Sequence, residues 1–368
     1  MVTKPEGFED WYVASSYQRF VEREGVPLYE GSGIEDLATL PLADWARRGG
    51  RAAYTRFGDD ETNCLQIVEI PPGGQLQPEH HMYDAVMFVL SGRGASAIWQ
   101  HGEQVQHVEW HEGSLLAVPL NAWHQEFNGS GTEPCRVVFG TNMPQAVNHY
   151  HNLDFIFDCG YAFTDRYTAE APTYFSDEGT HWNLRLFETN FIPDIRAFPL
   201  DPWPERGLRT SIMRLSMAST SLGIHILEVS EGTYVTAHRH YAGAHVIQVE
   251  GTGYEYLFLP GEQGDLAKYR RMPLAPYGVV APKDLEYHQH FNTGTQRFRQ
   301  LAFRGGGVRY GTGKTYNPVG AAISDDPFAW SHKIRHDDEP QRVRDEYYAE
   351  LERNGIGLRL EPIDQSGG

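Results

Sequence analysis

Four histidines in the second half of the sequence have the types and spacing of a metal site. His238 and His240 are two residues apart, and so are His288 and His290. On a β-strand, residues two apart point to the same face, so each pair presents both imidazoles on one side. Three imidazoles at one face bind divalent Fe, Mn, Ni, Cu or Zn, and the sequence does not choose among these metals. A lone histidine is usually a hydrogen-bonded core residue, but this pattern predicts a divalent metal ion on His238, His240 and His288.

The segment that carries His238 and His240 is the second copy of an internal repeat. The two copies align without a gap, with glutamate, glycine, histidine and alanine residues in register. A second pair of similar segments follows in the same order, and there His124 matches His288. Two matches in the same order indicate a duplication. The aligned segments are 66–94 with 225–253, and 113–128 with 278–292.

Both copies resemble the two conserved motifs of the cupin superfamily. The first motif is Gly, five residues, His-x-His, three or four residues, Glu, six residues and Gly. The second copy matches this motif at Gly232, His238, His240 and Gly251. The second motif is matched in the first copy by Gly113, Pro119, His124 and Asn128, with Asn121 in place of the inner glycine. This resemblance implies an all-β fold of two tandem cupin β-barrels, which are double-stranded jelly rolls, with short flanking helices.

The repeats divide the chain into five segments, and a helix is expected near each end, at about Phe8 to Glu24 and Glu339 to Arg353. The linker between the barrels is rich in aromatic and turn residues. The expected segments are an N-terminal helical extension (1–50), an N-terminal cupin barrel (51–147), a linker (148–205), a C-terminal cupin barrel (206–312) and a C-terminal extension with a helix (313–368).

Within the superfamily, the second copy looks like the ring-cleaving gentisate and salicylate dioxygenases. The likeness rests on His238-Arg239-His240, on His288-Gln289-His290, and on Ala244 where other cupins carry the glutamate ligand. It implies a metal-dependent oxygenase, with non-haem Fe(II) as the expected ion and a small aromatic or hydroxy-acid substrate. The alternatives are an oxygen-independent isomerase, decarboxylase or hydrolase, and a non-catalytic bicupin that binds or stores.

The absent glutamate has a consequence for the substrate. Three neutral histidines leave the charge of the ion uncompensated, which favours a small anionic, bidentate substrate. His290 and His245 are the candidate catalytic residues. His290 is a candidate acid or base at the cavity, with a hydrogen-bonded core residue as the alternative. His245 lies one residue past the glutamate position, so we favour a supporting or structural role for it over a fourth ligand.

Three further side chains, Arg297, Arg299 and Tyr256, lie on expected strands near the site. Each is a candidate partner for a substrate carboxylate, and each is equally well explained as an outward-facing residue.

The first copy carries Glu79, His81 and His124 at the aligned ligand positions. Two histidines and a carboxylate have the composition of a facial triad, so metal binding in this barrel is left open. We interpret the first barrel as mostly structural, because only the second copy has the His-x-His pair.

Composition excludes several classes of partner. The net charge of −18 opposes binding to nucleic acid, and no apolar run has the length of a membrane span. The polar N-terminus does not look like a signal peptide. The three isolated cysteines fit a reducing cytoplasm. Because open sheet edges need to be covered, we expect a homo-oligomer.

Overall fold

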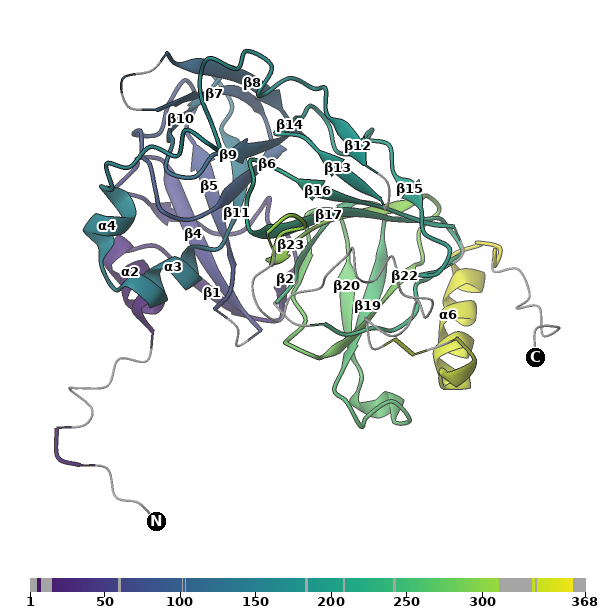
Figure 1. Cartoon of the computed structure of the whole chain (residues 1–368). Helices are drawn as coiled ribbons and strands as arrows, with labels where there is room; N and C mark the ends of the chain where they lie inside the picture. Colours follow the sequence, from purple (N-terminus) through teal and green to yellow (C-terminus); the bar gives the residue numbers. More distant parts are fainter. Residues whose placement is uncertain are drawn as a thin grey trace.

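The computed structural model describes most of the 368-residue chain. The described residues are 5–7, 15–58, 61–100, 102, 104–182, 185–207, 209–240, 243–310, 333–334 and 336–359. Two β-barrels lie side by side, the first drawn in purple to teal and the second in green (Figure 1). The expected all-β fold of two tandem jelly rolls is therefore confirmed.

The first barrel has an eight-stranded and a three-stranded sheet. The large sheet has the order β1 (Leu28–Gly31), β4 (Arg51–Phe57), β5 (Cys64–Ile70), β11 (Cys135–Thr141), β6 (Ala85–Ser91), β9 (Leu115–Val118) and β14 (Phe191–Ile192), with β3 (Ala43–Asp44) paired to β4. The small sheet has the order β10 (Trp123–Asn128), β7 (Arg93–Trp99) and β8 (Gln106–His111). The central strands of the large sheet are buried on both faces, one toward the interior of this barrel and the other toward the second barrel.

The second barrel repeats this topology. Its nine-stranded sheet has the order β12 (Thr180–Trp182), β13 (Leu186–Glu188), β16 (Thr210–Ser216), β17 (Leu222–Val229), β23 (Phe298–Gly305), β18 (His245–Glu250), β21 (Val279–Val280) and β2 (Gly33–Ile34), with β15 (Asp201–Pro202) paired to β16. Its small sheet has the order β20 (Arg270–Leu274), β19 (Gly253–Phe258) and β22 (Tyr287–Asn292). The run β17–β23–β18–β21 corresponds to β5–β11–β6–β9 of the first barrel.

The segments outside the repeats contribute strands to both barrels. β2 comes from the N-terminal segment and pairs with β21 of the second barrel. β14, between the two repeats, pairs with β9 of the first barrel, while β13 pairs in parallel with β16 of the second. The expected N-terminal extension and linker therefore close the edges of both large sheets.

The large sheets pack against each other through one apolar core. A single cluster of buried residues contains Leu65 and Phe88 of the first barrel together with Ile226 and Leu301 of the second. A Cβ atom at Gly140 would lie 2.4 Å from the Phe303 ring, so only glycine at this position admits that ring. Burial of this shared core holds the two barrels together.

The helices are short and peripheral. They are α2 (Ser16–Glu24), α3 (Met143–Tyr150), α4 (Leu153–Phe157) and α6 (Gln341–Arg353), with 3-10 turns at η1 (Leu266–Lys268) and η2 (His336–Asp338). The two helices expected from the sequence correspond to α2 and α6; residues 8–14 lie outside the described part of the chain. Ser15 caps α2 by accepting a hydrogen bond from the Gln18 amide. No helix among the described residues is long and apolar enough to cross a membrane.

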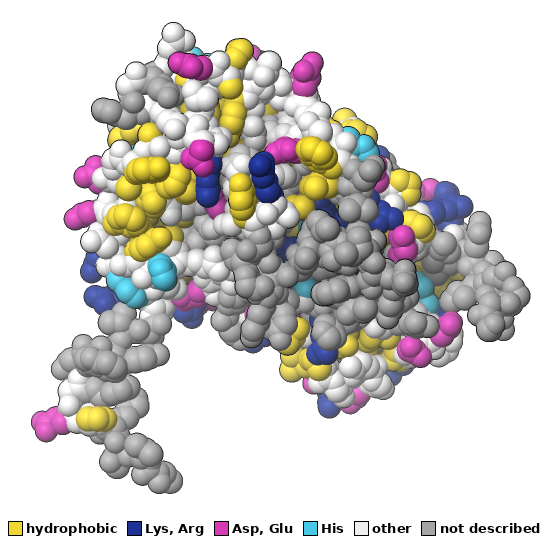
Figure 2. Space-filling model, viewed as in Figure 1, with side chains coloured by type: hydrophobic (Ala, Val, Ile, Leu, Met, Phe, Trp, Pro, Cys, Tyr) yellow, Lys and Arg dark blue, Asp and Glu magenta, His cyan; other side chains and the backbone are white. Residues whose placement is uncertain are grey.

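The surface has one apolar area on the side that carries α4 (Figure 2). Tyr150, Phe155 and Tyr161 are exposed large side chains there, and the Tyr150 and Phe155 rings are 4.7 Å apart.

Candidate metal centre and anion cavity

His238 and His288 are held together by the backbone. The His238 amide donates to the His288 carbonyl at 3.0 Å, and the His288 amide donates to the His238 carbonyl at 2.8 Å. Residues two apart on β22 share a face, so His290 points into the barrel with His288. All three side chains are buried. The strand pairing thus fixes where the imidazoles can meet.

The imidazoles of four histidines lie close together in the second barrel. Ligand atoms of His238, His288 and His290 all lie within 4.8 Å of one another. The His240 ring is nearer by centroid, 4.9 Å from His288 and 5.6 Å from His238, whereas the His290 ring is 5.6 Å and 5.9 Å from the same two. Because donor atoms form the bonds to a metal, His290 is the third ligand that the positions of the nitrogen atoms favour, with His240 next to the group.

His290 has a carboxylate behind it. Its Nδ1 lies 3.1 Å from a carboxylate oxygen of Glu255, which is fully buried on the adjacent strand β19. The angle of this contact is outside the range of a hydrogen bond. A carboxylate behind a histidine is a common arrangement around bound metals, because it fixes the ring and raises its basicity. Glu255 was not predicted from the sequence, although the alternation along its strand indicates that its side chain points into the barrel.

The surroundings keep His238 and His288 neutral. Burial, followed by the charge of Arg206 and by His288, lowers the pKa of His238 well below its ordinary value. Burial and the neighbouring His240 and His290 lower the pKa of His288 in the same way. Metal binding requires neutral imidazole, so this environment suits a ligand.

The donor set fits a divalent metal ion. Nδ1 of His238 is buried and has no hydrogen-bond partner among the described residues, which is costly unless the atom binds something. His288 makes only a 3.4 Å contact from Nδ1 to the Glu286 carbonyl, and its other nitrogen remains for a ligand. Imidazoles in this number suit Fe, Cu, Ni, Mn or Zn.

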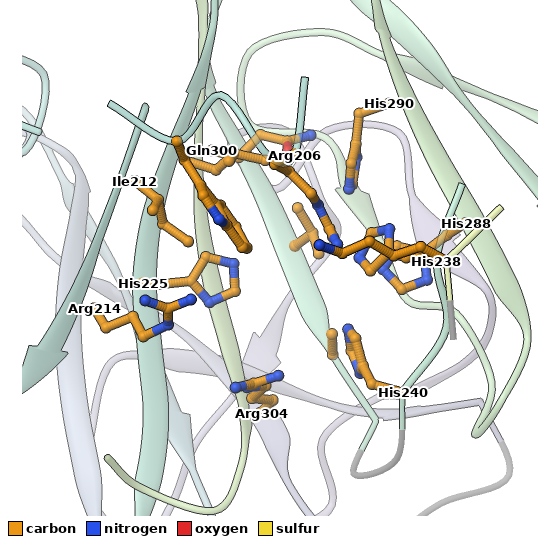
Figure 3. A pocket seen from close by; sticks show the side chains of 15 residues that line it. Arg206, Ile212, Arg214, His225, His238, His240, His288, His290, Gln300 and Arg304 are labelled. Carbon is orange, nitrogen blue, oxygen red and sulfur yellow. The ribbon is translucent and has the colours of Figure 1, made fainter. Parts of the chain in front are cut away.

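The histidines lie at one wall of a cavity of about 690 Å³, part of it open to solvent (Figure 3). The described residues that line the cavity include four cationic side chains and no carboxylate. The lining residues are Trp203, Arg206, Ile212, Arg214, His225, Leu227, His238, His240, Ala244, Val246, His288, His290, Gln300, Arg304 and Lys333.

Two of the cationic residues are anchored next to the histidines. The Thr236 amide donates to the Arg206 carbonyl at 3.1 Å, and the Ile334 amide donates to the Ala237 carbonyl at 2.9 Å, which places Lys333 beside the same strand. Burial and the charge of Arg206 lower the pKa of Lys333 to about 7. The lowering of this pKa reflects burial first and the neighbouring positive charge second.

The cationic residues of the cavity differ from those named from the sequence. Arg299 pairs with Glu228 and donates to the carbonyls of Ile195, Arg196 and Phe198, just as Arg136 of the first barrel pairs with Glu69 and donates to the carbonyls of Leu37, Ala38 and Leu40. Arg297 is half-exposed and pairs with Glu228 as well. The Tyr256 hydroxyl donates to Glu346. These three residues hold loops and a helix, so they are not substrate partners in this structure.

His245 lies away from the cavity. Its neighbours Ala244 and Val246 line the cavity, so alternation along the strand turns His245 to the opposite face. There its Nδ1 is 2.7 Å from the Asn63 amide nitrogen, and its ring packs on Phe57 of the first barrel. Burial lowers its pKa to about 4. The expectation of a catalytic role for His245 is corrected accordingly, and it is not carried into the proposed site.

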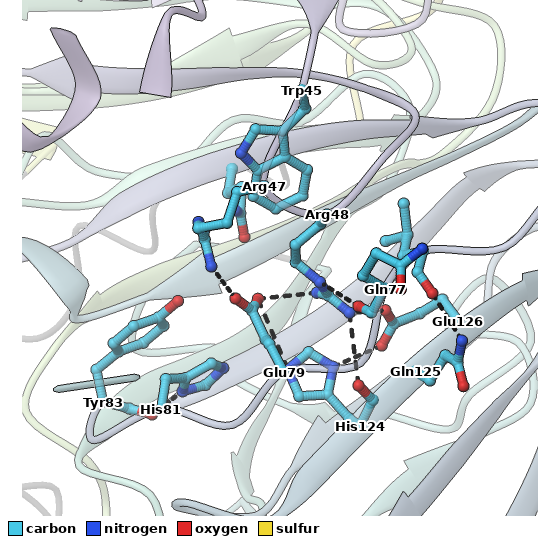
Figure 4. A network of polar contacts seen from close by, with 12 residues as sticks. Trp45, Arg47, Arg48, Gln77, Glu79, His81, Tyr83, His124, Gln125 and Glu126 are labelled. Carbon is cyan, nitrogen blue, oxygen red and sulfur yellow. Dashed lines mark hydrogen bonds and ion pairs between the residues drawn. The ribbon is translucent and has the colours of Figure 1, made fainter. Parts of the chain in front are cut away.

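The first barrel contains a polar network at the equivalent place (Figure 4). Ligand atoms of Glu79, His81 and His124 lie within 4.8 Å of one another. The Glu79 carboxylate accepts hydrogen bonds from Arg47 and, at 2.8 Å, from the buried Arg48. Arg48 also pairs with Glu126 at 2.8 Å.

This network already neutralises its carboxylates. Burial alone would raise the pKa of Glu79, but the charges of Arg47 and Arg48 hold it well below its usual range. The same balance, with His124 and Arg48 as the opposing charges, lowers the pKa of Glu126 to about 2. A guanidinium beside the triad opposes a second cation, so the geometry favours a structural role for this barrel.

Comparisons with known proteins agree with this architecture. Residues 66–140 match the cupin domain family. No curated protein matches the chain. Similar solved structures include a variant of Bacillus subtilis oxalate decarboxylase (12% identity, TM-score 0.50, 81% of this chain and 82% of that one). Others are salicylate 1,2-dioxygenase from Pseudaminobacter salicylatoxidans (13%, 0.48, 72% and 73%) and hazelnut vicilin from Corylus avellana (12%, 0.47, 74% and 85%).

At these identities the likeness is one of fold. With a cupin domain in the first half and the same topology repeated in the second, the chain is a bicupin of the cupin superfamily.

Proposed function

We propose that this bicupin is a metal-dependent enzyme that acts on a small anionic molecule in the second barrel. One observation carries the proposal: a buried group of histidines with ligand atoms within 4.8 Å of one another lies at the wall of a cavity lined by arginines and a lysine. The metal would be held by His238, His288 and His290, with His240, the ligand expected from the sequence, at the edge of the same group. A non-catalytic storage role would not require such a group.

Each element of the site has a task in this proposal. A bound divalent ion supplies Lewis acidity to an oxygen of the substrate. Arg206 and Lys333 attract the anion and hold one of its acidic groups beside the histidines. Glu255 fixes the ring of His290. Apolar side chains such as Ile212 and Leu227 exclude water from the body of the substrate, which strengthens the charge interactions around it.

We propose further that the reaction consumes dioxygen and that the native ion is Fe(II). A donor set of neutral imidazoles supports this, because it leaves charge on the ion for an anionic substrate and positions for a second small molecule. The small aromatic or hydroxy-acid substrates expected from the sequence carry an anionic group, which the cationic lining of the cavity would attract. Mn, Ni, Cu and Zn are the other ions that such ligands accept.

The test is an oxygen-electrode screen of hydroxybenzoates and aliphatic hydroxy-acids, with protein purified without chelators and its metal content determined. Oxygen uptake that His288→Ala abolishes and His81→Ala largely preserves would support the proposal, provided that circular dichroism shows both variants folded. Turnover at the same rate without oxygen would assign the protein to the isomerase, decarboxylase or hydrolase class. Turnover lost only in His81→Ala would move the site to the first barrel.

Two further proposals concern the cellular compartment and the oligomeric state of the protein. Cys64, Cys135 and Cys159 are free thiols, which supports a reducing compartment such as the cytoplasm. The exposed apolar area near α4 supports a homo-oligomer.

A further inference from the structure

The cavity is lined by a second group of basic side chains, on the side away from the metal-site histidines. Arg214, His225 and Arg304 lie on three neighbouring strands of the large sheet, β16, β17 and β23. Arg214 is the cross-strand partner of His225, and Arg304 is two residues from Ala302, which is the partner of His225 on the other side. Neighbouring strands bring such side chains together on one face. Figure 3 shows the three grouped on one side of the cavity, with Arg206 and the metal-site histidines on the other.

This group also lines a space of its own. A smaller cavity of about 240 Å³ adjoins the first and shares only these three residues with it. Its remaining lining is Gly223, Ile224, Gly306, Gly307 and Val308. The three side chains therefore stand where the main cavity opens into a recess lined largely by backbone.

The glycines of the recess are required by close contacts. A Cβ atom at Gly223 would lie 2.6 Å from the Gly306 carbonyl oxygen and 2.8 Å from Cγ of Arg304. A Cβ atom at Gly307 would lie 2.5 Å from the Thr220 carbonyl oxygen. The absence of side chains lets Arg304 lie along the strand and leaves room beside its guanidinium.

The charges of the group act on one another. Burial, then the charges of Arg304 and Arg214, lower the pKa of His225 well below its ordinary value. Arg214 and Arg304 also have contacts elsewhere in the protein. The argument needs only that their side chains border the cavity, because two cations at one wall create a positive potential that favours an anion.

Apolar side chains line the cavity together with the two basic groups. Ile212 is two residues before Arg214 on β16, and Leu227 is two residues after His225 on β17, so both face the cavity. Trp203, Ala244 and Val246 complete the apolar lining. The cavity therefore combines two groups of basic side chains with apolar walls.

We propose that Arg214, His225 and Arg304 form a second anion subsite, and that the substrate is a small diacid with an apolar body between its two acidic groups. This proposal rests on the proposed function in one respect, the role of the metal-site histidines. Carboxylate, sulfonate and phosphonate share the oxyanion chemistry that arginine binds. Binding to this subsite does not itself require a metal.

The test is calorimetric titration with matched probes on the full chain, with metal and after chelation. The probes are benzoate, the three benzenedicarboxylates, 4-sulfobenzoate and 4-phosphonobenzoate. At least one diacid should bind about tenfold more tightly than benzoate. Arg304→Gln should remove most of that advantage and leave benzoate affinity and metal content unchanged, and Arg304→Lys should restore part of it.

Two controls keep the outcome clear. Arg214→Gln provides a second variant if Arg304→Gln does not fold, and Arg309→Gln, which removes an exposed arginine paired with Glu188, should change nothing. If every diacid binds like benzoate, or if Arg304→Gln weakens benzoate equally, the subsite does not exist. A preference for diacids that depends on Arg304, in a protein without metal or turnover, would support the subsite while overturning the proposed function.

Discussion

Glu79 and His238 occupy the same position in the two barrels. Each exchanges a pair of backbone hydrogen bonds with the histidine of the following motif, Glu79 with His124 at 2.8 and 3.0 Å and His238 with His288 at the same two distances. Two residues further along each strand, Glu126 of the first barrel stands where His290 stands in the second. The same backbone thus carries a carboxylate pair around Arg48 in one barrel and an imidazole pair in the other.

The second barrel is expected to hold the metal ion. Purified protein should contain close to one divalent ion per chain, and His288→Ala should lose it, because His288 is central to the histidine group. Elemental analysis by mass spectrometry measures this directly. His81→Ala is the matched control and should retain the ion. Wild-type metal content in the His288→Ala protein would contradict the assignment.

Glu255 is expected to tune the affinity for the ion. Glu255→Gln should weaken metal binding about 10- to 100-fold, because the carboxylate behind His290 orients the ring. Competition with a chromogenic chelator gives the affinity. Glu109→Gln, which changes an exposed glutamate of the first barrel, is the control. Equal affinities in Glu255→Gln and wild type would show that the carboxylate does not act on the ion.

The network around Arg48 is expected to stabilise the fold in a pH-dependent way. The pKa of Glu126 is about 2 in the folded chain against 4.5 as the ordinary value, so its contribution is fully present above about pH 4.5 and is lost as the pH falls toward 2. Glu126→Gln should cost about 3 kcal/mol of unfolding free energy at pH 7, because it leaves Arg48 partly unpaired in a buried site.

Urea unfolding across this pH range measures the effect. The difference between Glu126→Gln and wild type should shrink as the pH falls, whereas the exposed Glu133→Gln should show no difference at any pH. A difference that stays constant down to pH 3 would refute the electrostatic origin.

His245 is expected to matter for stability and not for the metal. His245→Ala removes a buried contact to Asn63 and the packing on Phe57 between the two barrels. A loss of about 2 to 3 kcal/mol in unfolding free energy should follow, with metal content unchanged. Thermal unfolding and elemental analysis of the same sample separate the two effects. Loss of the ion at unchanged stability would return His245 to the site.

The chain is expected to associate. Light scattering at micromolar concentration should give the mass of a dimer or a larger homo-oligomer, because an exposed aromatic area such as that of Tyr150 and Phe155 is more stable when covered. A monomer mass across the concentration range would rule this out. Phe155→Glu is an informative variant, since it should shift the mass toward the monomer if this area is the contact.

Much of the candidate site could be read from the sequence because strands have a period of two. The His-x-His spacing at 238–240 and 288–290 was enough to predict that these side chains share a cavity, and the repeat predicted the barrels. The cationic residues were assigned to the wrong positions of β23. Arg299 and Arg304 are five residues apart on this strand and so face opposite sides, and the sequence alone did not show which of the two sides faces the cavity.

Other residues of the cavity carry no periodic signal. Arg206 and Lys333 enter from loops, and their positions depend on single backbone hydrogen bonds to Thr236 and Ala237. Sequence spacing contains no information about such contacts. Glu255 and Arg214, by contrast, lie on regular strands, and a buried charge at an inward position was a signal that alternation could have supplied.

The short strand β2 has a consequence for how this chain folds. Gly33 and Ile34 pair with Val280 and Val279. The two paired strands come from opposite halves of the sequence. A Cβ at Gly33 would lie 2.1 Å from the Val279 carbonyl oxygen, so the contact tolerates no other residue. β2 of the N-terminal segment completes the second barrel, and β14 of the linker completes the first. Neither half of the chain is therefore a self-contained folding unit. The two halves form a single cooperative unit, and a cut between them yields fragments that need each other to become native.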